Sequence, residues 1–480
     1  MRAEEEHAAL TDLYSYPLIS ALQQRRTRRV ARGVSINARR ASHESANEPE
    51  PLTPLEEAIL IVTTGVTGLG VLHDGPTVRR DGRPELETPF LYVLARTGSS
   101  PDNAQATSFF VTSDEGTWLI KKLAGRRARE FVQSFPTRWS DWTEQMWLDA
   151  AEVVKHKLYD DRIEYPRHYP YYLNWNNQHS NAPGTTVFIP VVDCTYQYIN
   201  AMFATLGHPA DERPLYIDDF RHFRPRSMQD WVAWAAAKLR LIDPIPYQPV
   251  GGIKMAKSGD VNAENFIPLG YGRTLRTDYE AFFLLQNLML VAEALGLGAW
   301  IHASIFEPYI FQRDEASGFR GLGFREHGSA VGEGRWAPLP AAMPNFVGID
   351  GVLEGLCPPY MSTDEAVDRV LEMKFGPDGA YGDAATFGHS YRTQSVAEAY
   401  LENVEAPPKE VVAYVKQICR YIYETYGRFP AHNMAFHSPG VWLQLSHLEL
   451  EYYEKVADPS FFSRQARHDD LWHPDDRSER

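Results

Sequence analysis

Residues 274–298 read TLRTDYEAFFLLQNLMLVAEALGLG, and this stretch carries the clearest structural signal in the chain. Its apolar residues recur at helical spacing, which predicts a helix with one face buried. Thr277 and Glu280 fit the T-x-x-E capping box of a helix start, and Gly296 stands where the residue just beyond a helix adopts a positive φ angle. The stretch therefore predicts a long helix packed on a core.

Length and composition indicate a globular protein with a large core. The chain has 480 residues, 44% of them hydrophobic. Asp and Glu (63) outnumber Lys and Arg (48), and the net charge of −15 argues against a nucleic-acid-binding surface over most of the chain. No stretch reaches the roughly 18 consecutive apolar residues of a membrane span, and the acidic N-terminus lacks an apolar leader. We therefore expect a cytoplasmic protein without a membrane partner.

Cysteines and histidines suggest neither disulfides nor a metal site. Cys194, Cys357 and Cys419 are far apart and odd in number, which favours a reducing compartment. The histidines of the C-terminal part show no recognised metal-binding spacing such as HExxH or HxH. They are His432, His437, His447, His468 and His473. We accordingly predict no metal site.

Patterns of composition and periodicity divide the chain into five segments. They are an N-terminal arm (1–50), a segment that opens with a helix at Thr53–Pro54 (51–125), an insertion (126–244), a compact α+β segment (245–358) and a mostly helical C-terminal extension (359–480). Within them we expect strand, loop and strand over 89–113, a helix over 142–158 and a strand over 185–192. No internal repeat is evident.

A cluster of arginines stands out in this acidic chain. Residues 23–29 read QQRRTRR, with four arginines in five positions. Pro17 predicts a short helix over 17–26, whose C-terminal end a basic cluster would complement. The same residues fit a surface patch, a nucleic-acid-binding arm, or a phosphate site, because the planar guanidinium of arginine binds phosphate oxygens bidentately. These alternatives stay open on the arginines alone.

Two further motifs favour the interpretation of the arginines as a phosphate site. Ser100, Asn103 and Gln105 form S-x-x-N-x-Q in a polar loop before a predicted strand. The long helix ends in a G-L-G turn that leads into a strand, within QNLMLVAEALGLGAWIHASIF at 286–306. Together with Arg25-Arg26-Thr27-Arg28-Arg29, which matches R-R-S-x-R with Thr for Ser, this order of motifs resembles the nitroreductase family of FMN-dependent oxidoreductases.

The resemblance spans roughly residues 15–125 and 245–355. It implies an α+β, three-layer fold in which a central, mainly antiparallel sheet is flanked by helices, with a helical extension added. The family's basic residues near the C-terminus have no evident match here. Neither the insertion nor the last 120 or so residues has a counterpart in a typical member.

The resemblance also implies a set of cofactor-binding residues. Arg25 and Thr27 would face the FMN phosphate, and Arg29 the pyrimidine edge of the flavin. The amide of Ala303 or Ser304 would lie near flavin N5. The full set comprises Arg25, Arg26, Thr27, Arg29, Ser100, Asn103, Gln105, Gly298, Ala303 and Ser304. No catalytic acid is identified; His302 lies near the expected flavin face, where it is either a ligand contact or a core histidine.

The implied function is hydride transfer through flavin N5, with NADH or NADPH as electron donor. The substrate would be a dedicated small organic molecule: a nitro, quinone or enone compound, or a biosynthetic intermediate. A homodimer with flavin at the interface is expected. The alternatives are a non-catalytic FMN-binding protein and a flavin-free protein that binds another phosphate ligand. The aromatic tract 164–177 either covers the flavin or packs within the insertion.

Overall fold

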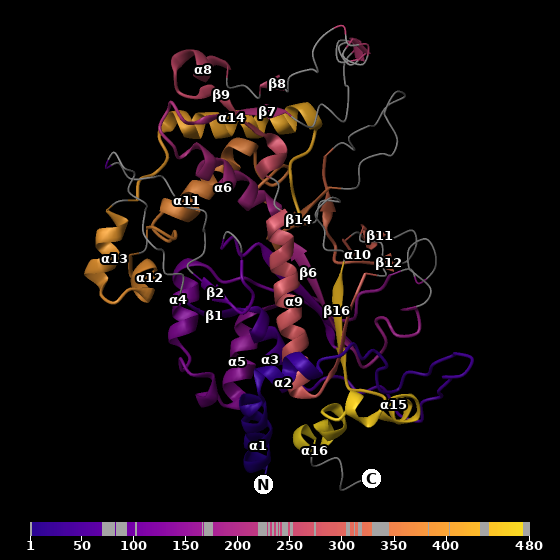
Figure 1. Cartoon of the computed structure of the whole chain (residues 1–480). Helices are drawn as coiled ribbons and strands as arrows, with labels where there is room; N and C mark the ends of the chain where they lie inside the picture. The colour runs from indigo at the N-terminus through magenta and orange to yellow at the C-terminus, as the bar shows by residue number, and fades with distance from the viewer. Residues whose placement is uncertain are drawn as a thin grey trace.

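A computed structural model provides the structure of the chain. It describes residues 2–69, 82, 94–100, 103–165, 167, 176–218, 228, 231–232, 235–236, 239, 241, 248–249, 253–272, 275–303, 308–311, 313–314, 319–328, 345–382, 384–402, 404–432 and 441–473. These residues form a mixed α+β structure in which long helices lie along one side of a six-stranded sheet (Figure 1).

The six-stranded sheet is antiparallel at every pairing. Its strand order is β10-β16-β6-β3-β4-β5. The strands are β3 (Thr107–Ser113), β4 (Gly116–Ile120), β5 (Lys155–Tyr159), β6 (Thr186–Val192), β10 (Gly298–His302) and β16 (Trp442–Ser446). The prediction of an α+β protein with a mainly antiparallel sheet is confirmed.

The two faces of the sheet bury different side chains because successive residues of a strand point to opposite sides. Phe109 and Val111 of β3 pack in the core beneath the helices α3 (Pro54–Thr64), α5 (Glu144–Val154) and α9 (Leu275–Leu295). Phe110, between them, packs in an aromatic cluster on the opposite face. In Figure 1, α9 runs along the sheet beside α3 and α5.

Local signals explain the start of α3. Thr53 is the N-cap, Pro54 occupies the first turn, and Glu56 completes a capping box with Thr53. The prediction of a helix start at Thr53–Pro54 is therefore confirmed. All residues of β6 lie within the strand predicted over 185–192.

The capping box predicted for the long helix is wrong, although the helix itself is present. α9 begins at Leu275, so Thr277 lies inside its first turn. The Glu280 carboxylate instead accepts hydrogen bonds from the backbone N–H groups of Ala106 and Thr107. Gly296 has φ = 90°, as its place beyond the helix end predicted.

A second core lies beyond the end of the sheet, at the top of Figure 1. It is built by α6 (Cys194–Leu206), α11 (Thr363–Phe375) and α14 (Lys409–Tyr426). The small sheet β8-β7-β9 joins it, with β7 (Pro214–Asp218) paired in parallel with β9 (Asn262–Pro268) and antiparallel with β8 (Gln248–Pro249).

Short elements complete the described structure. The helices are α1 (Arg2–Ser15), α2 (Leu18–Gln24), α4 (Gly125–Gln133), α8 (Ile253–Ser258), α10 (Pro308–Phe311), α12 (Ala384–Phe387), α13 (Gln394–Leu401), α15 (Leu450–Val456) and α16 (His468–Trp472). The strands are β1 (Val66–Leu69), β2 (Leu94–Arg96), β11 (Arg313–Asp314), β12 (Phe319–Arg320), β13 (Arg325–Glu326), β14 (Phe346–Ile349) and β15 (Leu353–Glu354). Among the helices described, none has the length and apolar character needed to cross a membrane.

Two parts of the sheet differ from the sequence prediction. The helix expected over 142–158 ends at Val154, and Lys155–Tyr159 forms the edge strand β5. The C-terminal extension contributes β16 between β10 and β6, although it was predicted to be mostly helical. Strands from four of the five predicted segments thus share one sheet.

Candidate functional site

The arginine segment lies against the edge strand of the sheet. α2 ends at Gln24, so the helix predicted over 17–26 is shorter and leaves Arg25 and Arg26 beyond its last residue. The backbone then runs extended, and the N–H of Arg28 donates to the carbonyl oxygen of Ala299 in β10 at 3.1 Å. Two motifs far apart in sequence are therefore neighbours.

Arg28 anchors the segment from inside. It is 2% exposed, and its Nη1 lies 2.6 Å from Oε2 of Glu293 in α9. Its Nε donates to the carbonyl oxygen of Phe461 at 2.7 Å. Because side chains of an extended backbone alternate, burial of Arg28 leaves Thr27 and Arg29 exposed.

The side chains on the outer side of the arginine segment have hydrogen-bond donors available to bind an anion. The Arg25 guanidinium and the Thr27 hydroxyl make no hydrogen bond or ion pair with any described residue. Within the described part of the chain, Arg26 donates only to backbone carbonyls, those of Gln23 and of Arg25. Arg29 donates to Oδ1 of Asn176 at 3.2 Å, which ties the insertion to this segment. Two cations and a hydroxyl suit a phosphate group.

Aromatic and imidazole rings gather farther along β10. Trp300 and His302 stack with ring centroids 4.0 Å apart. Trp442 of the neighbouring strand β16 is the pairing partner of His302, and the centroids of the two rings are 5.2 Å apart. The edge of His179 meets Trp300 at 6.4 Å. The four rings form one continuous group, here called the β10 ring cluster.

Five nitrogen atoms of the β10 ring cluster are buried without a hydrogen-bond partner among the described residues. They are Nε1 of Trp300, Nε1 of Trp442, Nδ1 of His179, and both ring nitrogens of His302. Buried polar atoms in folded proteins are nearly always hydrogen-bonded, so this many atoms without a described partner in one place leave hydrogen-bonding capacity for a polar ligand or for ordered water.

Burial also keeps both imidazoles neutral. It lowers the pKa of His302 to about 3. Burial, and to a smaller extent the positive charge of Arg29, lower the pKa of His179 to about 4. At neutral pH each ring therefore offers one donor and one acceptor nitrogen, which suits the polar edge of a heterocycle.

The S-x-x-N-x-Q loop is an unusual piece of backbone. Asn103 and Gln105 have φ angles of 46° and 49°, a region that residues other than glycine rarely occupy. Gln105 donates through Nε2 to Oδ1 of Asn103 at 2.7 Å and through its backbone N–H to Oγ of Ser100 at 3.3 Å. Its Oε1 is buried and has no hydrogen-bond partner among the residues that the structure describes. Strained backbone of this kind clusters at ligand sites.

Within a single copy of the protein, this loop and the arginine segment lie far apart. The residues after the loop bond to Glu280, near the start of α9, whereas Arg28 pairs with Glu293 near its end. At 1.5 Å per residue, the two glutamates are separated by about 20 Å along the helix. The motifs therefore mark opposite ends of α9.

The remaining predicted residues lie at both ends of β10. A Cβ atom on Gly298 would overlap Leu448, so this glycine permits a close packing contact. Ala303 is exposed directly after the strand, and Ser304 lies outside the described residues. Of the aromatic tract, Tyr165 packs on Trp442 at 5.2 Å and bonds to Ser180; residues 168–175 lie outside the described part.

Sequence reasoning missed most of the β10 ring cluster. Trp300 and Trp442 look like ordinary core residues in sequence, and only strand pairing places them around His302. His179 carries no local motif. Comparisons of the chain with protein-family models, curated proteins and solved structures find no match.

Proposed function

We propose that this chain is an FMN-dependent oxidoreductase of the nitroreductase type that works as a homodimer. The observation that carries the proposal is the hydrogen bond from Arg28 to Ala299. It joins the R-R-T-R-R segment to the strand that the family resemblance assigns to the flavin. The unpartnered nitrogens of the β10 ring cluster, on that same strand and its neighbours, support a polar ligand there.

The residues present fit FMN. Arg25 and Thr27 would hold the phosphate, with Arg29 beside the pyrimidine edge, where a cation stabilises negative charge. Neutral His302 would supply a hydrogen-bond donor or acceptor without adding charge. When bound, FMN supplies the hydride chemistry between NADH or NADPH and a small organic substrate. The chain itself would bind and orient the flavin and shield it from solvent. No described residue is assigned as a catalytic acid.

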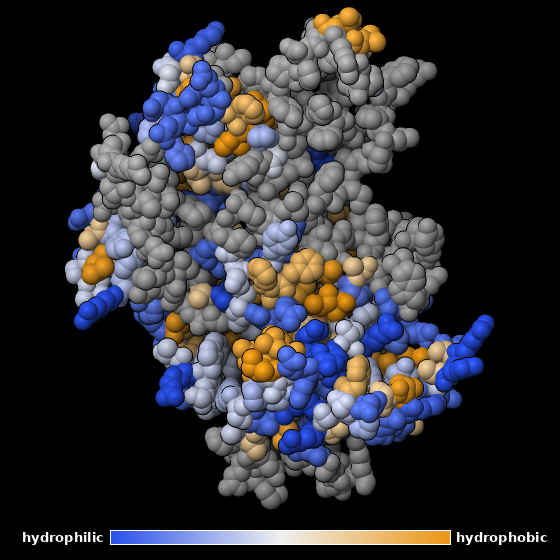
Figure 2. Space-filling model, viewed as in Figure 1, coloured by the Kyte–Doolittle hydropathy of each residue, from blue (hydrophilic) through white to orange (hydrophobic). Residues whose placement is uncertain are grey.

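A second copy of the chain would complete the site. Because the loop of Ser100, Asn103 and Gln105 lies at the other end of α9 from the arginines, the partner's loop would reach the flavin held by this chain's arginines. Exposed apolar side chains on α2 and α9 support such a contact. They are Leu18, Ile19, Leu22, Tyr279, Phe282 and Phe283. Figure 2 shows hydrophobic patches on the face where Figure 1 displays these two helices.

The insertion supports a dedicated substrate. Asn176 accepts a hydrogen bond from Arg29, so the insertion lies beside the arginine segment, where it would contact a bound substrate. Such added contacts favour one small substrate over a broad range of acceptors. Nitro, quinone and enone compounds, or a biosynthetic intermediate, remain the classes that this chemistry serves.

The absorbance spectrum of the purified protein tests the proposal, followed by mass identification of any molecule released on heating. We expect a flavin spectrum, the mass of FMN, and bleaching when NADH or NADPH is added without oxygen. Bound FMN that neither nicotinamide bleaches would instead indicate a flavin-binding protein. A colourless protein that takes up no added FMN would refute the assignment and leave another phosphate ligand for the arginines.

A further inference from the structure

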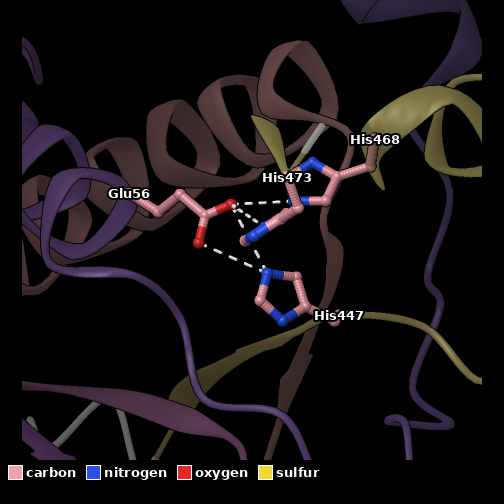
Figure 3. Close-up of side chains that lie close together, drawn as sticks. All are labelled: Glu56, His447, His468 and His473. Atoms are coloured by element: carbon pink, nitrogen blue, oxygen red, sulfur yellow. Dashed lines mark hydrogen bonds and ion pairs between the residues drawn. The ribbon is translucent and has the colours of Figure 1, made fainter. Parts of the chain in front are cut away.

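Four side chains of the types that bind metals converge next to the C-terminal end of α9. Glu56 comes from the first turn of α3, His447 follows β16, His468 begins α16, and His473 lies just after α16 (Figure 3). Oε1 of Glu56 lies 2.8 Å from Nε2 of His468, 3.4 Å from Nε2 of His447 and 3.5 Å from Nε2 of His473.

Hydrogen bonds at the back of two rings determine which nitrogen carries the proton. Nδ1 of His447 lies 3.2 Å from the carbonyl oxygen of Glu50, and Nδ1 of His468 lies 2.8 Å from that of Leu295. Since a carbonyl oxygen only accepts, both Nδ1 atoms must donate. In a neutral ring, Nε2 then presents a lone pair to the Glu56 carboxylate; Nε2 of His447, within hydrogen-bond distance of both Glu56 oxygens, can instead hold a second proton and pair with the carboxylate. Lone pairs facing a carboxylate repel unless a cation lies between them.

Protons alone account poorly for this arrangement. Nε2 of His468 and Nε2 of His473 are near Oε1 of Glu56, yet neither makes a hydrogen bond of acceptable geometry. A proton on His447 would pair that ring with the carboxylate but leave Nε2 of His468 and of His473 without a hydrogen bond. Protonating all three imidazoles would bury three positive charges around a single carboxylate, which is costly in a site this closed to solvent. A single divalent cation satisfies all four donor atoms at once.

The distances from Glu56 fit a tetrahedral metal site, and all four ligand atoms lie within 4.8 Å of one another. Metal bonds of about 2.1 Å in a tetrahedron place neighbouring ligand atoms about 3.4 Å apart. The three separations from Oε1, between 2.8 and 3.5 Å, lie around that value. We propose that Glu56, His447, His468 and His473 bind one Zn²⁺ ion.

Ligand type and number favour zinc in a structural role. A site with three imidazole ligands does not suit Mg²⁺ or Ca²⁺, because these ions bind oxygen ligands. Four protein ligands fill a tetrahedral shell and leave no open position for substrate, which is typical of structural zinc. Backbone carbonyls that hold the Nδ1 atoms give the outer contacts that usually orient metal-bound histidines.

The ion would join the two ends of the chain beside the proposed flavin site. The N–H of Arg32, in the N-terminal arm, donates to the carbonyl oxygen of His447. His468 packs directly on Gly296, whose φ of 90° ends α9 two residues before β10. Zinc would therefore hold the C-terminal segment and the arm against the base of α9.

A neighbouring group shows why residue types alone do not make such a site. His43, Glu449 and Glu451 also lie close together. The Glu449 carboxylate, however, already accepts hydrogen bonds from Gly33 and Asn47, and from Ser45. Its oxygens are already occupied by contacts that hold the arm in place, so we do not assign a metal ion to this second group.

Metal analysis of the purified full-length protein tests the inference. Elemental analysis should find about one zinc per chain, and removal with a chelator should lower the melting temperature. Adding Zn²⁺ alone should restore it, with a shift of about 5 °C or more. Co²⁺ added to the stripped protein should give the visible absorption of tetrahedral cobalt. FMN content, measured in the same samples, separates this result from the proposed function.

Two variants and one control sharpen the test. Glu56→Gln retains the helix cap, because glutamine also serves in a capping box, but loses the anionic ligand. His473→Ala removes the ligand nearest to solvent. Both should lose zinc, whereas His389→Ala, at an exposed histidine outside the cluster, should retain it. Wild-type protein that holds no zinc, gives no cobalt spectrum and melts unchanged with Zn²⁺ would overturn the proposal, whatever the variants do.

Discussion

The backbone N–H of Arg28 donates to the carbonyl oxygen of Ala299 at 3.1 Å and joins the arginine segment to the edge strand β10. The guanidinium of the same residue pairs with Glu293 inside the protein. One arginine thus positions its neighbours, Thr27 and Arg29, on the outer side of the segment. Substitutions at Arg28 should therefore affect stability, whereas substitutions at its outward neighbours should affect cofactor binding.

Replacing Arg25 by Glu together with Thr27→Val should release flavin. Hydrogen bonds to charged groups contribute about 1.5–3 kcal/mol each, so each lost contact should weaken FMN binding by roughly 10- to 100-fold. Fluorescence titration of the stripped protein with FMN measures this. Arg39→Glu, which alters an exposed arginine of the arm, is the matched control. Unchanged FMN affinity in the double variant would contradict the phosphate assignment.

The Arg28→Met variant should unfold more easily than wild type, without a direct change in the contacts to the cofactor. It leaves the Glu293 carboxylate buried without its cation, which costs about 3–5 kcal/mol in the free energy of unfolding. The double variant Arg28→Met/Glu293→Gln should recover much of that loss. Denaturant unfolding of both proteins without FMN gives the comparison. Equal stability of the single variant and wild type would show that the pair is not an anchor.

His302 should make the flavin-free protein less stable in acid. Its pKa falls from 6.5 to about 3 on folding, so the unfolded chain binds more protons between these values. The free energy of unfolding therefore falls as pH drops below about 6.5, by up to about 1.4 kcal/mol per pH unit from this residue.

His302→Phe should remove that contribution while retaining the stack on Trp300. The difference in unfolding free energy between wild type and variant should shift by about 2 kcal/mol between pH 7 and pH 5. Parallel pH profiles of the two proteins would show that His302 does not titrate in this way.

Ile19→Glu or Phe283→Glu should yield monomers. Each places a charge on the exposed apolar surface of α2 or α9, which a second copy is proposed to cover. Because that copy would supply Ser100, Asn103 and Gln105, FMN should be lost together with the dimer. Light scattering after size-exclusion chromatography, with FMN content per chain, measures both. Val153→Glu, at an exposed valine of α5, serves as control; monomers that keep FMN would refute a shared site.

Ending the chain at residue 358 should abolish folding. This deletion removes β16, which lies between β10 and β6, so β10 loses its strand partner. It also removes Leu443 and Leu445 from the main core. Circular dichroism and size-exclusion chromatography should show aggregated or unfolded protein, whereas a chain ending at His473 should stay folded. A stable yellow dimer from the longer deletion would show that the extension is an accessory.

The sequence alone determined the features that depend on neighbouring residues. The capped start of α3 at Thr53, the strand β6 and the turn at Gly296 follow from local hydrogen bonds and backbone preferences. The mixed α+β class followed from the same kind of signal. For the candidate site, sequence identified the arginine segment and the loop of Asn103 and Gln105.

Only the tertiary structure decided how distant residues combine. Sequence pattern assigned Glu280 to a local cap, yet its carboxylate binds backbone N–H groups of the segment before β3. Nothing local indicated that β16 would enter the sheet, or that Trp442 would meet His302. His447, His468 and His473 lack a metal spacing but converge on Glu56, because a ligand set depends on distance in space and the spacing along the chain does not record it.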